Sequence, residues 1–518
     1  MTTLDAAASS ITVNSVFQNA FRIYSGRVAV TSEDGSQTYS EIGERSARLA
    51  AALTELGVRK GDRVAVLSET RPEYVETYAA LASLGVTALT LNIRLHAQEI
   101  EYCIATGKPV AIIVSEPLLH LVDALRSREC SISDWICLEP GIDGYVSYEE
   151  LLAGAGGPPP VVEISGDDIH NVLYTSGTTG RPKGAMISQS AAAVRALRLA
   201  QWFALTPEDG FIGWLPLFHC GGDESLYATM LTGGRFAALR KADPETMFRV
   251  IERDRLSWSL LLPGVLTDFL YHPRRTDYDL TSLRFAIGYA NMMPLVVQEL
   301  TRECDIDFYD AFGQTEASYV LAHGMSGPGE MPSLHKTPTP LMEVRITDAE
   351  MNEAPVGVPG ECVVRGPSVM SGYLDDPEAT EEVFRGGWLH TGDILVRHED
   401  GTVSYVDREK FLVKTGGENV YPAEVEKVIA QMDAVQEVCV FGVPDERWGE
   451  TVKAVVVLRP GASATAAEVA EHCRAQLAGY KRPRYVQFMS EDQLPRSATG
   501  KLQRHVLATN PVTDGESV

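Results

Sequence analysis

The sequence predicts an α/β protein with a large N-terminal body and a smaller α+β C-terminal part, and three observations lead to this class. The chain has 518 residues, roughly three to four times the usual domain size, so one compact core is not expected. Apolar strands alternate with amphipathic helices along the first half, as in parallel sheets covered by helices. From about Met342 short strands with period-two patterning replace this alternation, which resumes after Asp407.

The first half of the chain has the pattern of repeated βαβ units. Thr38 and Glu41 have the spacing of a capping box and begin a helix that ends before Gly57. Pro72 is suited to the first turn of a second helix, which extends to about Leu84. Strands of the same layers are expected at 63–67, 86–91, 110–115, 171–174 and 284–287.

The later elements are shorter and end in a second series of helices. The strands expected in the middle region cover 344–346, 361–364 and 402–406, with a hairpin turn at Asp400-Gly401 before the last of them. Helices are expected at 422–429 and 466–477. The breaker-rich segment 154–160 is either a domain linker or an internal loop, and residues 511–518 are expected to form a loose tail.

Composition and charge exclude several classes of function. Hydrophobic residues make up 45% of the chain and charged residues 22%, as in a folded globular protein. The net charge of −25 repels nucleic-acid backbones and anionic lipid but permits a local basic pocket for a small anion. There is no secretory signal pattern and no apolar run near the roughly 18 residues of a membrane helix.

The cysteines indicate a reducing compartment. The chain has eight of them, and none falls in a C-x-x-C pair, so neither a disulfide framework nor a zinc site is expected. We therefore expect a large cytoplasmic enzyme.

The strongest local motif is Tyr174-Thr-Ser-Gly-Thr-Thr-Gly-Arg-Pro-Lys-Gly184, directly after an apolar strand. Its glycines allow a tight turn, and its hydroxyl, N–H and lysine groups can surround phosphate oxygens. The spacing is not that of a Walker loop. The alternative is a flexible surface loop. The candidate phosphate-binding residues are Thr175, Ser176, Gly177, Thr178, Thr179, Gly180 and Lys183.

A second motif is Asp310-Ala-Phe-Gly-Gln-Thr-Glu316, after a strand ending at Tyr309. A carboxylate and a hydroxyl beyond a tight glycine could hold hydrated Mg²⁺ against phosphates, and Phe312 could present its ring to a base. The alternative is a loop with a helix N-cap at Thr315.

Four further residues carry little weight alone. Asp393, in His-Thr-Gly-Asp, suits the hydroxyls of a ribose, although an acidic residue in a turn is more often structural. The same holds for Asp407, which precedes Arg408. His219 would usually be a packed core histidine. Lys501, in Pro-Arg-Ser-Ala-Thr-Gly-Lys, would usually be a surface lysine.

Taken in this order, the motifs resemble the adenylate-forming superfamily, in its acyl-CoA synthetase and ligase branch. The resemblance extends from about Val16 to Leu507. It includes the phosphate loop, 310–316, 390–393, Asp407-Arg408 with 416–422, and 495–501. The segment 370–373, Met-Ser-Gly-Tyr, is also typical of the ligase branch.

The resemblance implies the fold in more detail. It implies an N-terminal adenylating domain of residues 1–407, built from two stacked α/β layers and a small β-barrel-like part. It also implies a mobile C-terminal lid domain of residues 408–518. Lys410 would be the hinge.

The resemblance also implies the roles of the site residues. His219 would lie between the acid and the phosphate, and Lys501 would bridge the acid carboxylate and the α-phosphate, which Thr315 contacts. Thr175 and Glu316 would hold Mg²⁺, and Asp393 and Arg408 the ribose. The nucleotide and thiol sites would otherwise consist of Gly288, Tyr289, Ala290, Asp310, Ala311, Phe312, Gly313, Lys414, Gly416, Gly417 and Asn419. The acid pocket would include Trp214, Gly221, Gly222, Ile287, Gly313 and Ser318, and the small Gly221 would leave it open.

The implied reaction is an ATP- and Mg²⁺-dependent ligation of a carboxylic acid to coenzyme A. The acid attacks the α-phosphate to give an acyl-AMP and pyrophosphate, and the thiol then displaces AMP after the C-terminal domain rotates. Transfer to a carrier-protein thiol, oxidation of the adenylate and a non-catalytic binding role remain alternatives. Both a monomer and a homodimer are open.

Three features depart from the superfamily pattern. Phe411 replaces the acidic residue that usually follows the hinge, and Asn291 lies where the pattern has proline, beside the adenine loop. Asp223 and Glu224 follow the motif histidine. Either they belong to a pocket wall that recognises a polar or bulky acid, or they face solvent or cap a helix.

Overall fold

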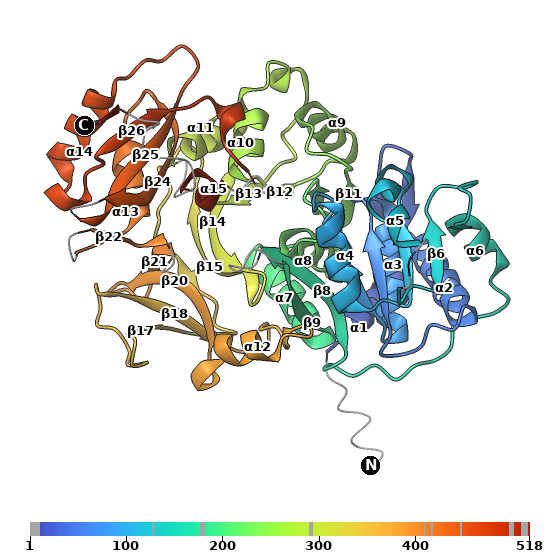
Figure 1. Ribbon diagram of the computed structural model, residues 1–518. Coiled ribbons are helices and arrows are strands. Elements are labelled where there is room, and N and C mark those ends of the chain that lie inside the picture. The colour runs from blue at the N-terminus through green and yellow to red at the C-terminus, as the bar shows by residue number, and fades with distance from the viewer. Residues whose placement is uncertain are drawn as a thin grey trace.

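The computed structural model describes residues 11–126, 128, 130–176, 182–289, 294–408, 411–415, 418–445, 448–496, 502–508 and 516–517. A large α/β body formed by the N-terminal part is followed by a smaller C-terminal domain, which confirms the predicted fold class (Figure 1). No helix within these ranges has the length and apolar character needed to cross a membrane.

Sheet A is the longer sheet of the N-terminal body. Its strand order is β16-β15-β14-β13-β12-β10-β11-β1-β2. The run from β14 to β1 pairs in parallel, whereas β15 returns antiparallel to β14. Parallel strands are covered on both faces, so they are continuous apolar runs, and every residue of β13 is buried. The bounds are β1 Val28–Thr31, β2 Ser36–Thr38, β10 Gly210–Gly213, β11 Arg235–Ala238, β12 Trp258–Leu260, β13 Phe285–Gly288, β14 Asp307–Gln314, β15 Ser318–Ser326 and β16 Thr337–Pro338.

Sheet B is the second layer of the body. Its order is β19-β9-β8-β4-β3-β5-β6-β7, parallel from β8 to β7, with β9 antiparallel to β8. The strands expected from the βαβ pattern are therefore confirmed. Their bounds are β3 Arg63–Leu67, β4 Thr87–Thr90, β5 Ala111–Val114, β6 Asp134–Cys137, β7 Val146–Ser147, β8 Ile169–Ser176, β9 Pro182–Ser188 and β19 Gly372–Tyr373.

The part predicted to be barrel-like is an open antiparallel sheet. Within the described chain its order is β17-β18-β20-β21, and the end strands β17 and β21 do not pair with each other. A barrel requires hydrogen bonds between its first and last strands, and these two edges do not meet. The bounds are β17 Glu343–Thr347, β18 Pro359–Arg365, β20 Leu389–Arg397 and β21 Val403–Arg408.

The C-terminal domain has its own sheet and core. The long antiparallel pair β24–β25 is flanked by β22 with β23 and by β26. Residues 516–517 pair with β26 as β27, so the expectation of a loose tail is wrong at these positions, because the edge of β26 can accept another strand. The bounds are β22 Val413–Thr415, β23 Glu418–Val420, β24 Val435–Asp445, β25 Gly449–Leu458, β26 Tyr485–Phe488 and β27 Glu516–Ser517.

Three helices begin at the residues predicted to start them. In α2 the Thr38 hydroxyl accepts from the backbone N–H of Glu41, whose carboxylate accepts from the Thr38 N–H over 2.7 Å. Pro72 and Pro422 start α3 and α13. The helices are α1 Val13–Ile23, α2 Tyr39–Glu55, α3 Pro72–Leu84, α4 Ala97–Gly107, α5 Asp123–Arg126, α6 Tyr148–Gly154, α7 Gln189–Trp202, α8 Cys220–Thr232, α9 Pro244–Asp254, α10 Pro263–Tyr271, α11 Pro294–Cys304, α12 Pro377–Val383, α13 Pro422–Ile429, α14 Ala466–Gln476 and α15 Arg504–Ala508.

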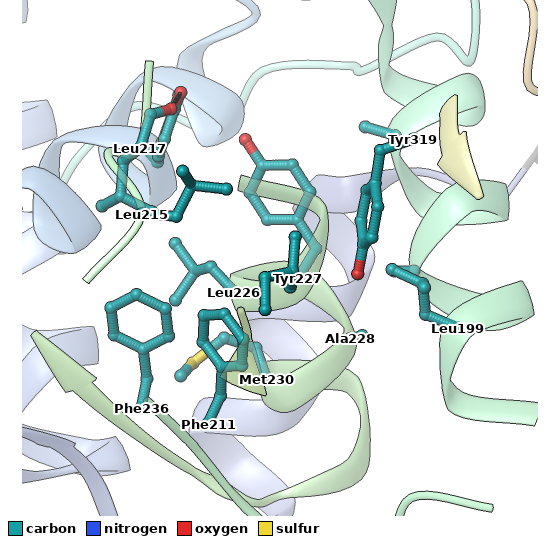
Figure 2. Close-up of a cluster of buried hydrophobic side chains, with 14 of the residues drawn as sticks. Leu199, Phe211, Leu215, Leu217, Leu226, Tyr227, Ala228, Met230, Phe236 and Tyr319 are labelled. Carbon is teal, nitrogen blue, oxygen red and sulfur yellow. Dashed lines mark hydrogen bonds between the residues drawn. The ribbon is translucent and has the colours of Figure 1, made fainter. Parts of the chain in front are cut away.

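Helix α8 lies in the main core between the layers. Figure 2 shows its Met230 beside Phe211 and Phe236 of sheet A, whereas the ring of its Tyr227 extends away from that pair. Nearly all of its residues are buried, as expected for a helix enclosed on every side. The segment from His219 onward is therefore held by the core.

Candidate functional site

The candidate phosphate loop connects β8 to β9. Thr175 lies opposite Lys183 in this antiparallel ladder, and its hydroxyl donates to the Lys183 carbonyl oxygen over 3.4 Å. The two residues therefore flank the connection from facing positions. Gly177, Thr178, Thr179 and Gly180, and the side chain of Ser176, lie outside the described residues.

Tyr373 links this loop to the second motif, although it was not among the predicted site residues. The Lys183 Nζ lies 5.2 Å from the centroid of the Tyr373 ring, within cation–π distance. The Tyr373 hydroxyl donates to Oε1 of Glu316 over 2.9 Å. Burial and the Glu316 charge raise the pKa of Tyr373, so the hydroxyl keeps its proton. The sequence signal was the Met-Ser-Gly-Tyr segment, which had no assigned role.

Thr315 and Glu316 occupy the turn between β14 and β15. Gln314 pairs with Ser318 at the base of this turn, and the Met370 N–H donates to the Glu316 carbonyl oxygen over 2.7 Å. The alternative of a helix N-cap at Thr315 is wrong, because the chain turns back into antiparallel pairing. The strand also does not end at Tyr309 but includes Asp310, Ala311 and Phe312.

Gly313 allows the two strands of this hairpin to approach closely. A Cβ atom on Gly313 would lie 2.2 Å from the Ser318 carbonyl oxygen and 2.5 Å from the Tyr319 carbonyl carbon. Backbone atoms cannot yield as a side chain can, so the turn requires glycine at this position.

The donors at this turn fit a hard cation. Glu316 is half-buried, and Oε2 has no hydrogen-bond partner among the described residues, since Tyr373 contacts Oε1. In nucleotide sites Mg²⁺ is held by one or two carboxylates and completes its shell with waters and substrate phosphates. The residues present therefore fit the expected ion.

Asp393 and Arg408 form the predicted ribose pair. They lie opposite each other on β20 and β21, and the Arg408 Nε donates to Oδ1 of Asp393 over 2.8 Å. Asp393 is 2% exposed. Its charge raises the pKa of Arg408, and the Glu316 charge acts in the same direction. The pair therefore lies within electrostatic reach of the Glu316 turn.

Asp310 has a buried partner that sequence reasoning missed. Nζ of Lys336 lies 2.5 Å from Oδ2 of Asp310, and both side chains are almost fully buried. The Lys336 backbone pairs with Val403 next to the small sheet. A lone lysine 26 residues from Asp310 carries no sequence signal. At the same strand, the Phe312 ring lies 6.2 Å from the Tyr405 ring.

Gly288 and Tyr289 follow β13 as predicted for the adenine loop. A Cβ atom on Gly288 would lie 2.5 Å from the Leu261 carbonyl oxygen, so close backbone packing requires this glycine. Tyr289 is half-buried. Ala290 and Asn291 lie outside the described residues.

The predicted acid-pocket residues come together around the start of α8. His219 is the N-cap of α8, and the Cys220 Sγ lies 3.6 Å from the Thr315 hydroxyl. Trp214 donates from Nε1 to the Leu260 carbonyl oxygen over 2.7 Å, and Ile287 is buried.

The two glycines at this point serve close packing. A Cβ on Gly221 would lie 2.6 Å from Leu215 and 2.9 Å from Leu260. The expectation that Gly221 leaves an opening on that side is therefore wrong, because apolar side chains fill the space. Gly222 packs against the Pro216 carbonyl oxygen, 2.3 Å from where a Cβ would lie.

Asp223 and Glu224 do not face solvent. They are 2% and 1% exposed. The Asn171 amide donates to Asp223 over 2.7 Å, and Nη1 of Arg195 lies 3.0 Å from Oε1 of Glu224. Burial, followed by the Glu224 charge, raises the pKa of Asp223 well above its ordinary value. The solvent-facing alternative is therefore wrong.

Several predicted residues of the C-terminal domain lie outside the described residues. They are Lys410, Gly416, Gly417, Lys501 and the side chain of Asn419. Lys414 is exposed on β22, and its backbone N–H donates to Glu450 over 2.8 Å.

Arg504, three positions after Lys501, has contacts on both sides of the predicted domain boundary. Its guanidinium donates to Glu426 over 2.6 Å and to Asp407 over 3.3 Å. It also lies 4.7 Å from the Phe411 ring. Phe411, which replaces the acidic residue of the superfamily pattern, thus contacts Arg504 through its ring, since an aromatic face attracts a guanidinium.

Comparison with known proteins agrees with this architecture. Residues 17–374 match the family of AMP-binding enzymes, and residues 424–501 match the AMP-binding enzyme C-terminal domain. A feruloyl-CoA synthase of Amycolatopsis is 34% identical over 467 residues, covering 90% of this chain and 92% of that protein. An indoleacetate–CoA ligase of Aromatoleum aromaticum is 33% identical, covering 92% and 94%.

A solved structure gives the same result. ATP-bound MatB from Rhodopseudomonas palustris is 31% identical, covers 96% of this chain and 98% of its own, and has a TM-score of 0.85. The chain therefore belongs to the family of AMP-binding enzymes, in its acyl-CoA synthetase branch.

Proposed function

We propose that this enzyme is an ATP-dependent ligase that joins a carboxylic acid to coenzyme A through an acyl-AMP. One observation carries the proposal: Lys183, Tyr373 and Glu316 form a continuous contact series, and the Glu316 charge acts on Arg408, which pairs with Asp393. Groups from the three strands β9, β20 and β21 and from the β14–β15 turn thus meet, as the assigned phosphate, metal and ribose contacts require.

The first half-reaction needs positioning and positive charge. A carboxylate that approaches an α-phosphate brings two anions together, so the enzyme must neutralise phosphoryl oxygens in the transition state. Lys183 and Lys501 supply charge, Thr315 contacts the α-phosphate and His219 separates acid from phosphate. Thr175 and Glu316 hold Mg²⁺, which when bound neutralises and orients the phosphates.

Lys336 extends the predicted adenine site. Its ion pair neutralises Asp310 inside the protein and ties β14, next to Phe312, to the segment that carries Lys336. The nucleotide base would rest against this strand and Tyr289, with Asp393 and Arg408 on the ribose.

The second half-reaction requires different groups at the same place. We place the domain boundary between residues 407 and 408, with Lys410 as the hinge. Rotation of residues 408–518 would remove Lys501 and bring Lys414, Gly416, Gly417 and Asn419 toward the thiol.

Because all eight cysteines are free thiols, we also propose that the enzyme works in the cytoplasm.

Acid-dependent pyrophosphate exchange tests the first step. Relatives are named for ferulate and indoleacetate, so the panel should begin with ring-bearing acids and add alkanoates. With an acid that it activates, the enzyme should release AMP faster when CoA is present. No exchange with any acid would refute adenylation, and AMP release indifferent to CoA would favour a carrier-protein acceptor.

Lys501→Ala tests the two-conformation mechanism. We expect adenylation to fall by about 100-fold or more, because a transition-state charge is lost, while supplied acyl-AMP is still converted to the thioester. Equal loss of both steps would contradict domain rotation.

A further inference from the structure

We infer that Arg195, Arg198, Glu224 and Ser318 form a buried network that positions the turn carrying Thr315 and Glu316. They act as positioning residues for the Mg²⁺-dependent adenylation step, and the inference rests on the proposed function. Nothing in the predicted site accounts for two arginines in the interior of this protein.

The network is fully buried and connects two helices to the β14–β15 hairpin. Arg195 and Arg198 on α7 and Glu224 on α8 are each 1% exposed. Glu224 pairs with Arg195 through Oε1 and accepts from the Ser318 hydroxyl through Oε2, over 3.0 and 2.5 Å. Arg198 donates to the same Ser318 hydroxyl oxygen. Ser318 is therefore held from both helices.

Ser318 has an unusual backbone conformation. Its φ is +125°, in the region that favours glycine, so the backbone of a non-glycine residue there is strained. Ser318 ends the turn whose middle residues are Thr315, Glu316 and Ala317. The hydrogen bonds of its side chain offset that strain and hold the conformation.

The same arginines reach the turn by a second route. Nε and Nη2 of Arg195 donate to the Ser368 carbonyl oxygen over 2.9 and 2.7 Å. The Ser368 hydroxyl donates to the Ala317 carbonyl oxygen over 2.7 Å. The turn is thus anchored at Ala317 and at Ser318, on the residues immediately after Glu316.

Stability alone does not explain such a network. A buried ion pair pays for desolvation and is often no more stabilising than apolar side chains of equal size, whereas its geometry is highly directional. Burial lowers the pKa of Arg198 to about 10, so Arg198 remains charged at neutral pH and keeps its directional bonds. The arrangement fits a need for exact placement of Glu316.

Ser318→Gly tests the inference without threatening the fold. Glycine accepts a φ of +125°, so the thermal midpoint should change little, while both side-chain anchors are lost. Because Ser318 also belongs to the predicted acid pocket, the assay is run at saturating acid, and we expect the Mg²⁺ concentration for half-maximal adenylation to rise about five-fold or more. ATP with Mg²⁺ should raise the thermal unfolding midpoint above its value in ATP with EDTA. This difference should be smaller in the variant than in the parent protein.

Glu224→Gln is the second variant, and Asp209→Asn is its matched control. Asp209 is a buried carboxylate paired with Arg284 near the start of β10. Both variants should lower the midpoint, but only Glu224→Gln should shift the Mg²⁺ dependence and the ratio of the half-reactions.

Two results would overturn the inference. One is an unchanged Mg²⁺ dependence in both Ser318→Gly and Glu224→Gln. The other is an equal loss of both half-reactions in Glu224→Gln. If the parent protein itself shows no acid-dependent exchange, the proposed function fails instead, and the two failures are thereby distinguished.

Discussion

At the scale of single residues, Tyr373 is the contact that joins the phosphate loop to the metal-binding turn. Its ring lies under Lys183 and its hydroxyl donates to Glu316. Tyr373→Phe keeps the ring and removes the hydroxyl. A hydrogen bond to a charged group contributes about 1.5–3 kcal/mol, so kcat/KM for adenylation should fall about ten-fold or more. The half-reaction rates with varied Mg-ATP measure this, and an unchanged KM and kcat would contradict the role.

His170 gives a prediction about pH. It is fully buried, its Nε2 lies 2.8 Å from the Tyr227 hydroxyl, and burial lowers the pKa of His170 to about 3. An unfolded histidine titrates near pH ~6.5, so the unfolded chain takes up a proton that the folded chain refuses. The free energy of unfolding therefore falls as the pH drops below about 6.5.

The expected loss between pH 7 and pH 5 is about 1–2 kcal/mol from this one group. His170→Asn should flatten the pH dependence by that amount, whatever its effect at pH 7. Urea unfolding of both proteins at the two pH values measures the difference. Parallel pH profiles would show that His170 is not the responsible group.

At the scale of elements, the β14–β15 hairpin determines where Thr315 and Glu316 lie. Gly313→Ala would put a Cβ 2.2 Å from the Ser318 carbonyl oxygen. The strands must then separate. We expect the free energy of unfolding to fall by about 1–3 kcal/mol and adenylation to be lost. Gly264→Ala on α10 is the control, since none of the described atoms lies within 4 Å of its Cβ. Denaturant unfolding compares the two, and equal effects would refute the steric reason.

At the scale of the whole molecule, Asp407 joins the small sheet to the C-terminal domain. It accepts from the Ala423 N–H at the start of α13 over 2.8 Å and from Arg504 over 3.3 Å. If residues 408–518 rotate, these two contacts must break. They therefore stabilise the present arrangement relative to the rotated one.

Asp407→Asn weakens the charge-assisted bond with Arg504. Because the present arrangement and the rotated one serve different half-reactions, we expect the ratio of the two half-reaction rates to change by about three- to ten-fold. Single-turnover measurements of each step separate the two. Slowing of both by the same factor would indicate general damage to the fold.

The charge of the whole molecule also gains a more specific meaning. A net charge of −25 opposes polyanions, yet ATP, the acid and CoA are all anions. Lys183 lies over the ring of Tyr373, whose hydroxyl donates to Glu316, and the Glu316 charge acts on Arg408, so positive groups gather locally on an acidic protein. The bulk charge excludes long nucleic acids without excluding small phosphates.

Much of the fold was predictable because its signals are local. The capping box of α2, the prolines that start α3 and α13, and the apolar runs of β3 and β13 depend on neighbours within a few residues. The strand β14 was predicted too short, since its extension past Tyr309 depends on pairing with β15. The open sheet replaced the expected barrel because strand closure is a property of spatial neighbours.

The sequence by itself determined the family, the α/β class and the residue types that the reaction needs, because these reside in ordered motifs. Only the tertiary structure decided that Lys336 neutralises Asp310, that Tyr373 contacts Glu316, and that Asp223 and Glu224 are buried. Each of these contacts joins residues on different elements. Their partners are chosen by packing and by the need to compensate buried charge, neither of which the order of residues displays.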